Sequence, residues 1–488
     1  MPARRRAPGH ARRGHCGELP QGYATDAALH GRDKSRSNPA KSWKIVAKLR
    51  ASQGGPLRGT VRVPGDKSIS HRSLILGALA AGRTTIAGLL EGDDILSTAG
   101  ALRALGSRIE RAPNGLWVVD GKGLGSFEEP GTTLDLGNSG TGVRLLMGVV
   151  ATSPFTSFFT GDASLCKRPM ARVTDPLRKM GVQFLTRSGN RLPLALTGAD
   201  EPTPIVYTLP VPSAQVKSAI LLAGLGTPGE TTVIEPEKTR DHTERMLRRF
   251  GAEVRVRDEG PNRHITIVGE PELKPMAVNV PGDPSSAAFL AVAALMVPGS
   301  HVRIEHVGMN PLRTGIFDSL REMGADIRFE NEREEDDEPT ADIVVKHSPL
   351  TAITVPAERA PSMIDEYPIF SMAAAIAKGT TRMAGLAELK VKESNRLAAI
   401  ADGLRACGVK VAEDGDELTV EGTGGGPTGG AEVDAHLDHR IAMSFLVLGM
   451  AAKHPVGVTG AETIGTSFPG FATLMGGLGA NIMAEGNA

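Results

Sequence analysis

Apolar residues recur along this chain in two alternating patterns, short strand-like runs and longer helical stretches rich in alanine. Residues 285–296 are apolar on every face, and a helix of this kind is buried. Other helical stretches have a polar face and end at a glycine, as in Met323-Gly324-Ala325, where a glycine just past the last periodic residue predicts a helix end. Because short apolar strands follow these turns, the pattern predicts an α/β fold.

The same arrangement occurs six times, at a spacing of roughly 70–80 residues. The six helix-ending turns place a glycine after an apolar residue: Leu105-Gly106-Ser107, Met180-Gly181-Val182, Phe250-Gly251-Ala252, Met323-Gly324-Ala325, Cys407-Gly408-Val409 and Leu478-Gly479-Ala480. Six helices rich in small residues precede them, with starts near Lys67, Asn138, Ser213, Asp283, Asp365 and His439. Two domains of three units are the simplest arrangement, with a midpoint near Pro281.

Composition narrows the class of protein. The chain has 488 residues, which suits two domains of about 200 residues each. Residues 1–50 hold 12 basic against 3 acidic side chains, so the rest of this formally neutral chain is mildly acidic and nucleic acid is not an expected partner. Three cysteines, Cys16, Cys166 and Cys407, form no disulfide framework or metal-site spacing, and no apolar run reaches the roughly 20 residues that span a bilayer. A cytoplasmic protein without membrane contact is expected.

The first 45 residues are Arg-rich, contain many prolines and glycines, and lack helical or strand periodicity. An Arg-rich, acid-poor leader is typical of an organelle transit peptide, but Glu18, Asp26 and Asp33 argue against one. We expect residues 1–45 to be a disordered basic tail, either a bacterial extension or an over-long start. A second irregular stretch, residues 330–338, is acidic and predicts a solvated hairpin loop.

Charged residues gather where the six small-residue helices begin. In the first, Asp66 is a candidate N-cap, which places Lys67, Ser68 and Arg72 in the first turns. Helix N-termini attract anions, so these side chains favour a phosphate or carboxylate site. Since Asp66 separates Gly65 from Lys67, the phrase is not a nucleotide-binding loop. For this segment taken alone, a capped, solvated helix start is the default interpretation.

The other helix starts repeat the pattern. They are Gly137-Asn138-Ser139-Gly140-Thr141, Lys167-Arg168-Pro169-Met170, Pro212-Ser213-Ala214-Gln215, Thr239-Arg240-Asp241, Ile364-Asp365-Glu366, Lys392-Glu393-Ser394-Asn395-Arg396 and Asp438-His439-Arg440. Each alone reads as a surface ion pair. Together, at equivalent places in a six-fold repeat, they predict a cleft between two domains that surrounds a small ligand with several negative charges.

These phrases, in this order, resemble the 5-enolpyruvylshikimate-3-phosphate (EPSP) synthase family, which joins phosphoenolpyruvate to shikimate 3-phosphate in the shikimate pathway. The resemblance runs from about residue 57 to residue 483. It implies the enolpyruvyl transferase fold, two inside-out α/β domains of three βαβαββ-like units each. The first domain would span residues 65–281, and the second residues 46–64 and 282–488, with the active site in the cleft between them. The family is usually monomeric and uses no metal or other cofactor.

The resemblance also implies a role for each matching residue. Asp365 would be the base for the 5-hydroxyl, Glu393 a proton donor or relay at the methylene carbon, and Lys67 a contact to both substrates. The residues expected to bind shikimate 3-phosphate are Lys67, Ser68, Arg72, Ser213, Ala214, Gln215, Arg240, Asp365 and Lys392. Those expected to bind phosphoenolpyruvate are Lys67, Gly140, Arg168, Gln215, Arg396 and Arg440. Gly140 would also decide whether the competitor glyphosate fits the phosphoenolpyruvate pocket.

Two other functions compete with this interpretation. The related UDP-N-acetylglucosamine enolpyruvyl transferase has a reactive cysteine where this chain has Ala163, and Cys166 lies too close to Arg168 to replace it. A non-catalytic sensor of sugar phosphates would gain nothing from Asp365 and Glu393 in a cationic cleft. One departure from the family is Thr466, where many relatives have a lysine before Ser467-Phe468-Pro469. The two halves are also expected to repel each other until anionic ligands close the cleft.

Overall fold

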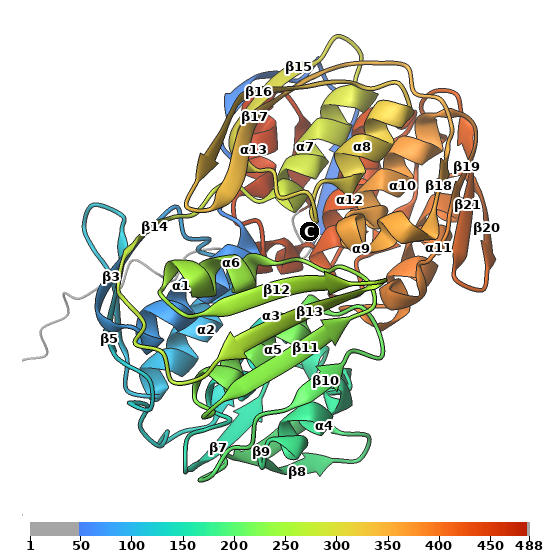
Figure 1. The fold of residues 1–488 in the computed structure, drawn as a ribbon. Helices are drawn as coiled ribbons and strands as arrows, with labels where there is room; N and C mark the ends of the chain where they lie inside the picture. Colours follow the sequence, from blue (N-terminus) through green and yellow to red (C-terminus); the bar gives the residue numbers. More distant parts are fainter. Residues whose placement is uncertain (1–47, 486–488) are drawn as a thin grey trace, which may run out of the picture. The chain divides into compact units, whose positions relative to one another are not determined.

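The structure of this protein is a computed structural model that describes residues 48–485, so the predicted tail at residues 1–45 lies outside the described residues. Residues 48–485 form six four-stranded sheets, and every sheet has the same topology (Figure 1). In each sheet the outer pair at one end is parallel and the other two pairs are antiparallel. Along the chain a unit runs strand, helix, strand, helix and hairpin, which confirms the predicted α/β fold of six repeats.

Three units are built mainly from the first half of the described sequence. The first contains β14 (Ala277–Asn279), α1 (Lys67–Leu79), β3 (Ala81–Ala87), α2 (Asp93–Ala104), β4 (Arg108–Arg111) and β5 (Trp117–Lys122). The second contains β6 (Leu134–Asp135), α3 (Gly140–Val149), β7 (Thr156–Thr160), the 3₁₀ turn η1 (Leu165–Lys167), α4 (Ala171–Lys179), β8 (Gln183–Arg187) and β9 (Arg191–Thr197). The third contains β10 (Val206–Thr208), α5 (Ala214–Leu225), β11 (Glu230–Glu235), α6 (His242–Arg249), β12 (Val254–Glu259) and β13 (Asn262–Val268).

The other three units use the second half and the first two strands. The fourth contains β2 (Arg58–Val61), α7 (Pro284–Met296), β15 (His301–Gly308), α8 (Gly315–Glu322), β16 (Asp326–Glu335) and β17 (Glu338–Lys346). The fifth contains β18 (Thr354–Val355), η2 (Ala357–Arg359), α9 (Ala360–Met363), α10 (Tyr367–Ile376), β19 (Lys378–Met383), η3 (Ala387–Val391), α11 (Arg396–Ala406), β20 (Lys410–Asp414) and β21 (Glu417–Thr423). The sixth contains β22 (Glu432–Asp434), α12 (His439–Ala451), β23 (Val456–Thr459), η4 (Ala461–Thr466), α13 (Phe471–Leu478), β24 (Asn481–Ala484) and β1 (Lys48–Ser52).

The chain passes between the two sets of units at two adjacent points. Strands β1 and β2 complete the sixth and fourth sheets, whereas β14 returns to complete the first. The two passing segments bond to each other, because the amide of Asp66 donates to the Pro281 carbonyl at 2.8 Å and the amide of Asp283 donates to the Pro64 carbonyl at 2.9 Å. The N-caps of α1 and α7 are therefore neighbours.

Two hydrophobic cores result. One is built from residues 69–280 and the other from residues 49–63 and 287–478. In the second, helices α7, α10 and α12 pack against one another, and each also packs against a strand of its own sheet. All 13 residues of α7 are buried, as its uniformly apolar sequence predicts. Small side chains let these helices meet closely at the centre, so the sheets lie on their outer sides (Figure 1).

The six helix-ending glycines behave as predicted. Each follows the last residues of its helix with a positive φ, between 82° and 110°, a conformation that disfavours residues with a Cβ. The positions are Gly106, Gly181, Gly251, Gly324, Gly408 and Gly479.

The acidic stretch at residues 330–338 forms a hairpin that is mostly exposed, except at Glu338 directly after the turn. Strand β16 continues to Glu335, and the chain turns at Asp336 and Asp337. Glu338 is buried and accepts hydrogen bonds from His242 Nδ1 at 2.6 Å and Asn310 Nδ2 at 3.0 Å. The predicted solvated hairpin is confirmed except at Glu338, which is buried because His242 of α6 and Asn310 ahead of α8 bind its carboxylate.

Candidate active site

The predicted helix starts meet at one cavity of about 730 Å³, lined by residues from both hydrophobic cores. Ten lysine and arginine side chains line it against six aspartate and glutamate side chains, so its walls carry an excess of positive charge. A cavity of this size suits small molecules, and this charge suits ligands with several anionic groups.

Thirteen of the fourteen predicted site residues line this cavity. They are Lys67, Ser68, Gly140, Arg168, Ser213, Ala214, Gln215, Arg240, Asp365, Lys392, Glu393, Arg396 and Arg440. Arg72 is the exception, because its guanidinium lies behind the wall and donates to Thr243 Oγ1, Ser218 Oγ and the Ser68 carbonyl. Burial lowers the pKa of Arg72 to about 10.

Side-chain caps hold several of the helices whose N-termini reach the cavity. Asp66 Oδ1 accepts from the Ile69 amide, as predicted, and Ser139 Oγ accepts from the Gly142 amide. Ser213, Asn395 and Asp438 cap α5, α11 and α12 in the same way. Since the positive end of each helix dipole points at the cavity, the caps fix a group of anion-attracting helix ends around it.

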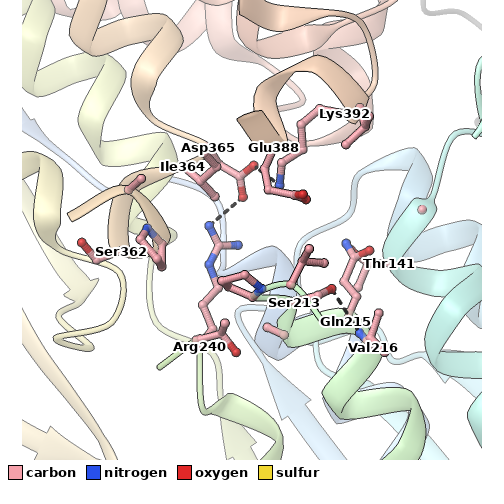
Figure 2. Close-up of a pocket in the computed structure, with 18 of the residues that line it drawn as sticks. Thr141, Ser213, Gln215, Val216, Arg240, Ser362, Ile364, Asp365, Glu388 and Lys392 are labelled. Carbon is pink, nitrogen blue, oxygen red and sulfur yellow. Dashed lines mark hydrogen bonds and ion pairs between the residues drawn. The ribbon is translucent and has the colours of Figure 1, made fainter. Parts of the chain in front are cut away.

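Asp365 lies between α9 and α10 and is surrounded by cations. Its Oδ2 is 2.6 Å from Arg240 Nη2, and its Oδ1 is 3.2 Å from Lys392 Nζ and 3.1 Å from Arg396 Nη1. Figure 2 shows Arg240 and Lys392 converging on this carboxylate. Burial alone would raise the pKa of Asp365, but these cations hold the pKa well below its ordinary value. The carboxylate is therefore ionised, which is the form that can accept a proton.

Glu393 is a second buried carboxylate of the cavity. Its Oε2 lies 2.5 Å from Arg396 Nη2 and its Oε1 lies 3.7 Å from Arg168 Nη1. Burial would raise the pKa of Glu393, but Arg396 and Arg168 hold the pKa well below its ordinary value. In the absence of a competing anion this carboxylate is ionised too.

Lys67, the third predicted catalytic residue, forms an ion pair with Asp94 in the first turn of α2. Asp94 is 4% exposed, and burial raises its pKa even though Lys67 opposes the shift. Asp94 is not among the site residues predicted from the sequence. Its position in the first turn of a helix was visible in the sequence, but its pairing with Lys67 was not.

Other cavity residues were also missed, although they connect the predicted ones. Arg144 Nη1 donates to Gln215 Oε1 at 2.9 Å and to the Gly140 carbonyl at 3.0 Å. Gln215 Nε2 donates to Thr141 Oγ1 at 2.9 Å. Burial lowers the pKa of Arg144 to about 10. The signal for Arg144 was its place four residues after Gly140, one helical turn further along α3. Arg172, Glu388 and His439 also line the cavity.

The two cores meet at the cavity through opposite charges. Arg240, on the side of the first core, pairs with Asp365 on the side of the second. Arg168 likewise faces Glu393 across the cavity. Arg172 donates to both carboxylate oxygens of Glu388 at 3.1 and 2.9 Å. The expectation that the halves repel each other without a ligand was wrong, because these acidic side chains occupy the places next to the arginines.

Neither cysteine of the described residues lines the cavity. Cys166 Sγ donates to the Gly161 carbonyl at 3.3 Å, and Cys407 is buried in the second core. Within residues 48–485 there is no group of three or more histidine, cysteine, aspartate or glutamate residues that could hold a metal ion. No helix in the same range is long and apolar enough to cross a membrane.

Comparison of the fold shows that the chain shares the fold of the enolpyruvyl transferases. The enolpyruvyl transferase NikO from Streptomyces tendae aligns over 90% of this chain and 99% of its own with a TM-score of 0.70, at 20% identity, which supports the shared fold alone. EPSP synthase from Acinetobacter baumannii aligns over 90% of this chain and 100% of its own, with a TM-score of 0.79 and 45% identity.

Comparison of the sequence identifies the family. The sequence profile of EPSP synthase (3-phosphoshikimate 1-carboxyvinyltransferase) matches residues 51–475. The 3-phosphoshikimate 1-carboxyvinyltransferase of Paramagnetospirillum magneticum is 63% identical over 443 residues, which cover 90% of this chain and 99% of that protein. The chain belongs to the EPSP synthase family. These matches support EPSP synthase and give no support to the alternative of a UDP-N-acetylglucosamine enolpyruvyl transferase.

Proposed function

We propose that this chain is a 3-phosphoshikimate 1-carboxyvinyltransferase, which transfers the enolpyruvyl group of phosphoenolpyruvate to the 5-hydroxyl of shikimate 3-phosphate and releases phosphate. The observation that carries the proposal is one cation-lined cavity in which two ionised carboxylates, Asp365 and Glu393, face arginines and a lysine. A receptor for anions has no use for these carboxylates, whereas a reaction that moves two protons requires them.

The two substrates divide the cavity. Shikimate 3-phosphate takes its contacts from Lys67, Ser68, Ser213, Ala214, Gln215, Arg240, Asp365 and Lys392, and phosphoenolpyruvate from Lys67, Gly140, Arg168, Gln215, Arg396 and Arg440. Arg72 supports the shikimate 3-phosphate site indirectly. Its guanidinium donates to the Ser68 carbonyl at 2.9 Å and to Thr243 of α6, and so fixes the position of Ser68. Each anionic group then meets at least one guanidinium or ammonium, which are strong partners for phosphate and carboxylate.

The addition begins at Asp365. As the 5-hydroxyl oxygen attacks C2 of phosphoenolpyruvate, Asp365 accepts the hydroxyl proton and Glu393 gives a proton to the methylene carbon, which becomes a methyl group. The product is a tetrahedral ketal. Because the anionic groups of phosphoenolpyruvate compete with Glu393 for Arg168 and Arg396, binding weakens the ion pairs that keep its pKa low and lets the carboxyl carry this proton.

The elimination reverses the proton transfer to the methylene carbon. Glu393 takes a proton back from the methyl group, the bond between C2 and the phosphate oxygen breaks, and the hydroxyl proton held by Asp365 leaves with the phosphate. The arginines that bound the phosphoenolpyruvate phosphate stabilise the charge on the departing group. Every step uses side chains of this chain and its two substrates.

The arrangement of domains belongs to the same proposal. We assign residues 65–281 to one domain, and residues 46–64 and 282–488 to the other, with the active site between them. The two hydrophobic cores and the two adjacent passing segments near Pro64 and Pro281 support this division. We further propose that the enzyme acts as a monomer in the cytoplasm.

Release of phosphate tests the function. The enzyme is expected to release phosphate when phosphoenolpyruvate and shikimate 3-phosphate are present together and from neither alone. UDP-N-acetylglucosamine, offered as the acceptor in a parallel reaction, is expected to yield none. Phosphate release with the nucleotide sugar and none with shikimate 3-phosphate would overturn the proposal, and binding of both substrates without release would indicate a sensor.

A further inference from the structure

His439 is the first residue of α12, lines the cavity and is only 4% exposed. Its Nδ1 lies 3.3 Å from Thr466 Oγ1 in the 3₁₀ turn η4. Its Nε2 is buried and has no hydrogen-bond partner among the described residues. A buried ring nitrogen without a partner beside a catalytic cavity requires an explanation, because such groups are rare in native proteins.

The hydroxyl of Thr466 determines which ring nitrogen carries the proton. A threonine hydroxyl has one hydrogen, and Thr466 Oγ1 gives it to the Thr463 carbonyl at 2.8 Å. Since a carbonyl oxygen only accepts, this bond leaves Thr466 Oγ1 as an acceptor toward His439. The proton of a neutral His439 then lies on Nδ1, and Nε2 presents a lone pair.

Burial, together with the cations around it, keeps the ring neutral. Burial is the main cause that holds the pKa of His439 well below its ordinary value, and Lys67, Arg440 and Arg396 lower it further, against the opposite effect of Glu393. A neutral ring has one donor nitrogen and one acceptor nitrogen, so the bond to Thr466 fixes both.

The same part of the molecule supports Lys67. A Cβ at Gly92 would lie 2.7 Å from the Thr466 carbonyl, so η4 packs directly on the start of α2. Two residues further along, Asp94 forms its ion pair with Lys67. An ammonium has three hydrogens, and this ion pair engages one of them.

We propose that Thr466 is a positioning residue that fixes neutral His439 with its proton on Nδ1, so that Nε2 accepts a hydrogen bond from Lys67 when substrates fill the cavity. With Asp94 and His439 each engaging one hydrogen, the remaining hydrogen of Lys67 points at the substrates. The inference rests on the proposed function for its effect on turnover, but the position of the ring proton is independent of activity.

Nuclear magnetic resonance tests the proton position directly. In protein labelled with ¹⁵N histidine, the ring signals present in wild type and missing from His439→Gln belong to His439. Wild type is expected to show a protonated Nδ1 and an unprotonated Nε2. Thr466→Val, which removes the acceptor, is expected to lose this preference, and Thr466→Ser to keep it. An Nε2-protonated ring in wild type, or the same tautomer in Thr466→Val, would overturn the inference.

Kinetics then separate positioning from structure. Thr466→Val is expected to lower kcat roughly three- to tenfold, the loss expected from one hydrogen bond, with little change in KM, and Thr466→Ser to restore it. Thr463→Val is the matched control, because it removes another hydroxyl of η4, one that donates to the Gly460 carbonyl and does not touch His439. Equal losses in Thr463→Val and Thr466→Val would overturn the inference. A wild type that releases no phosphate would refute the proposed function and leave the tautomer result standing.

Discussion

Two guanidinium groups lie close to the Cα of Gly140 and crowd any side chain added there. A Cβ built there would lie 2.8 Å from Arg144 Nη1 and 2.9 Å from Arg168 Nη1, closer than real Cβ contacts. Both arginines are long side chains that can move, so alanine is tolerated sterically, but the movement shifts the cations that face the phosphoenolpyruvate site. The family resemblance implies that Gly140 decides whether glyphosate fits the pocket, and the structure adds that a methyl at this position would displace the guanidinium groups of Arg144 and Arg168.

Gly140→Ala is therefore expected to weaken glyphosate binding more than phosphoenolpyruvate binding. Crowding by one methyl in a rigid site costs about 1–3 kcal/mol, or roughly a ten- to hundredfold loss of affinity for the longer inhibitor. The measurements are the inhibition constant for glyphosate and KM for phosphoenolpyruvate in both proteins. Gly100→Ala in α2 is the control, since a Cβ there meets nothing within 4 Å. Equal inhibition constants in wild type and Gly140→Ala would show that this position does not set inhibitor affinity.

Asp365→Asn tests the proposed base. The substitution preserves the shape of the side chain but removes the ionised proton acceptor, so kcat is expected to fall by about 10²-fold or more. KM for shikimate 3-phosphate is expected to change much less, because Arg240 and Lys392 remain to hold the substrate. Turnover within about threefold of wild type would remove Asp365 from this role.

At the level of helices and strands, local signals in the sequence were sufficient. Helix starts, the left-handed glycines and uniformly apolar helices such as α7 depend on residues within one or two turns, so they could be predicted. Pairing over long sequence distances could not. Arg172 and Glu388 are 216 residues apart, and neither sits in a motif that indicates the other. The burial of Glu338 was missed for the same reason, because its partners lie on α6 and next to α8.

Glu338→Gln is expected to lower the free energy of unfolding by about 1.5–3 kcal/mol at pH 7, because a buried carboxylate loses charge-assisted hydrogen bonds from His242 and Asn310. Burial alone would raise the pKa of Glu338, but His242 and these hydrogen bonds outweigh burial and hold the pKa below its ordinary value. A depressed pKa stabilises the fold above the unfolded-state value of about 4.3 and loses this effect as the pH falls through the folded-state value.

The difference between wild type and Glu338→Gln is therefore expected to be full at pH 7 and to shrink as the pH falls below about 4. Urea unfolding at several pH values measures it. Glu332→Gln, an exposed position on the same hairpin, is the control and should change stability by less than about 0.5 kcal/mol. A difference that grows toward acid pH would contradict the role given to Glu338.

In the whole molecule, the ion pairs across the cavity connect the two cores where the substrates bind. Arg240 and Arg168 pair with the proposed catalytic carboxylates, so an anionic substrate must compete with Asp365 and Glu393 for the same cations. Binding then changes the charge of the catalytic groups and the contact between the cores in one event. The pair Arg172–Glu388 differs, because neither residue has a proposed role in the chemistry and both are only partly buried.

Arg172 and Glu388 are therefore expected to affect activity by holding the two cores together. Arg172→Gln, Glu388→Gln and the double variant form a cycle in which kcat/KM is measured, and the double variant is expected to lose no more than either single variant. The coupling should be about 0.5–1 kcal/mol, or roughly two- to fivefold, as for a partly exposed pair.

The same cycle on Arg83 and Asp120 is the control, because this pair also forms two hydrogen bonds but joins strands β3 and β5 of one sheet. It is expected to leave kcat/KM unchanged. Small-angle scattering of the single Arg172 and Glu388 variants without ligand should show a larger radius of gyration than wild type, and both substrates should reverse the increase, since their anions link the cations of the two cores. Independent losses that add in the double variant, with an unchanged radius, would mean that each residue acts on the substrate by itself and that the pair does not hold the cores together.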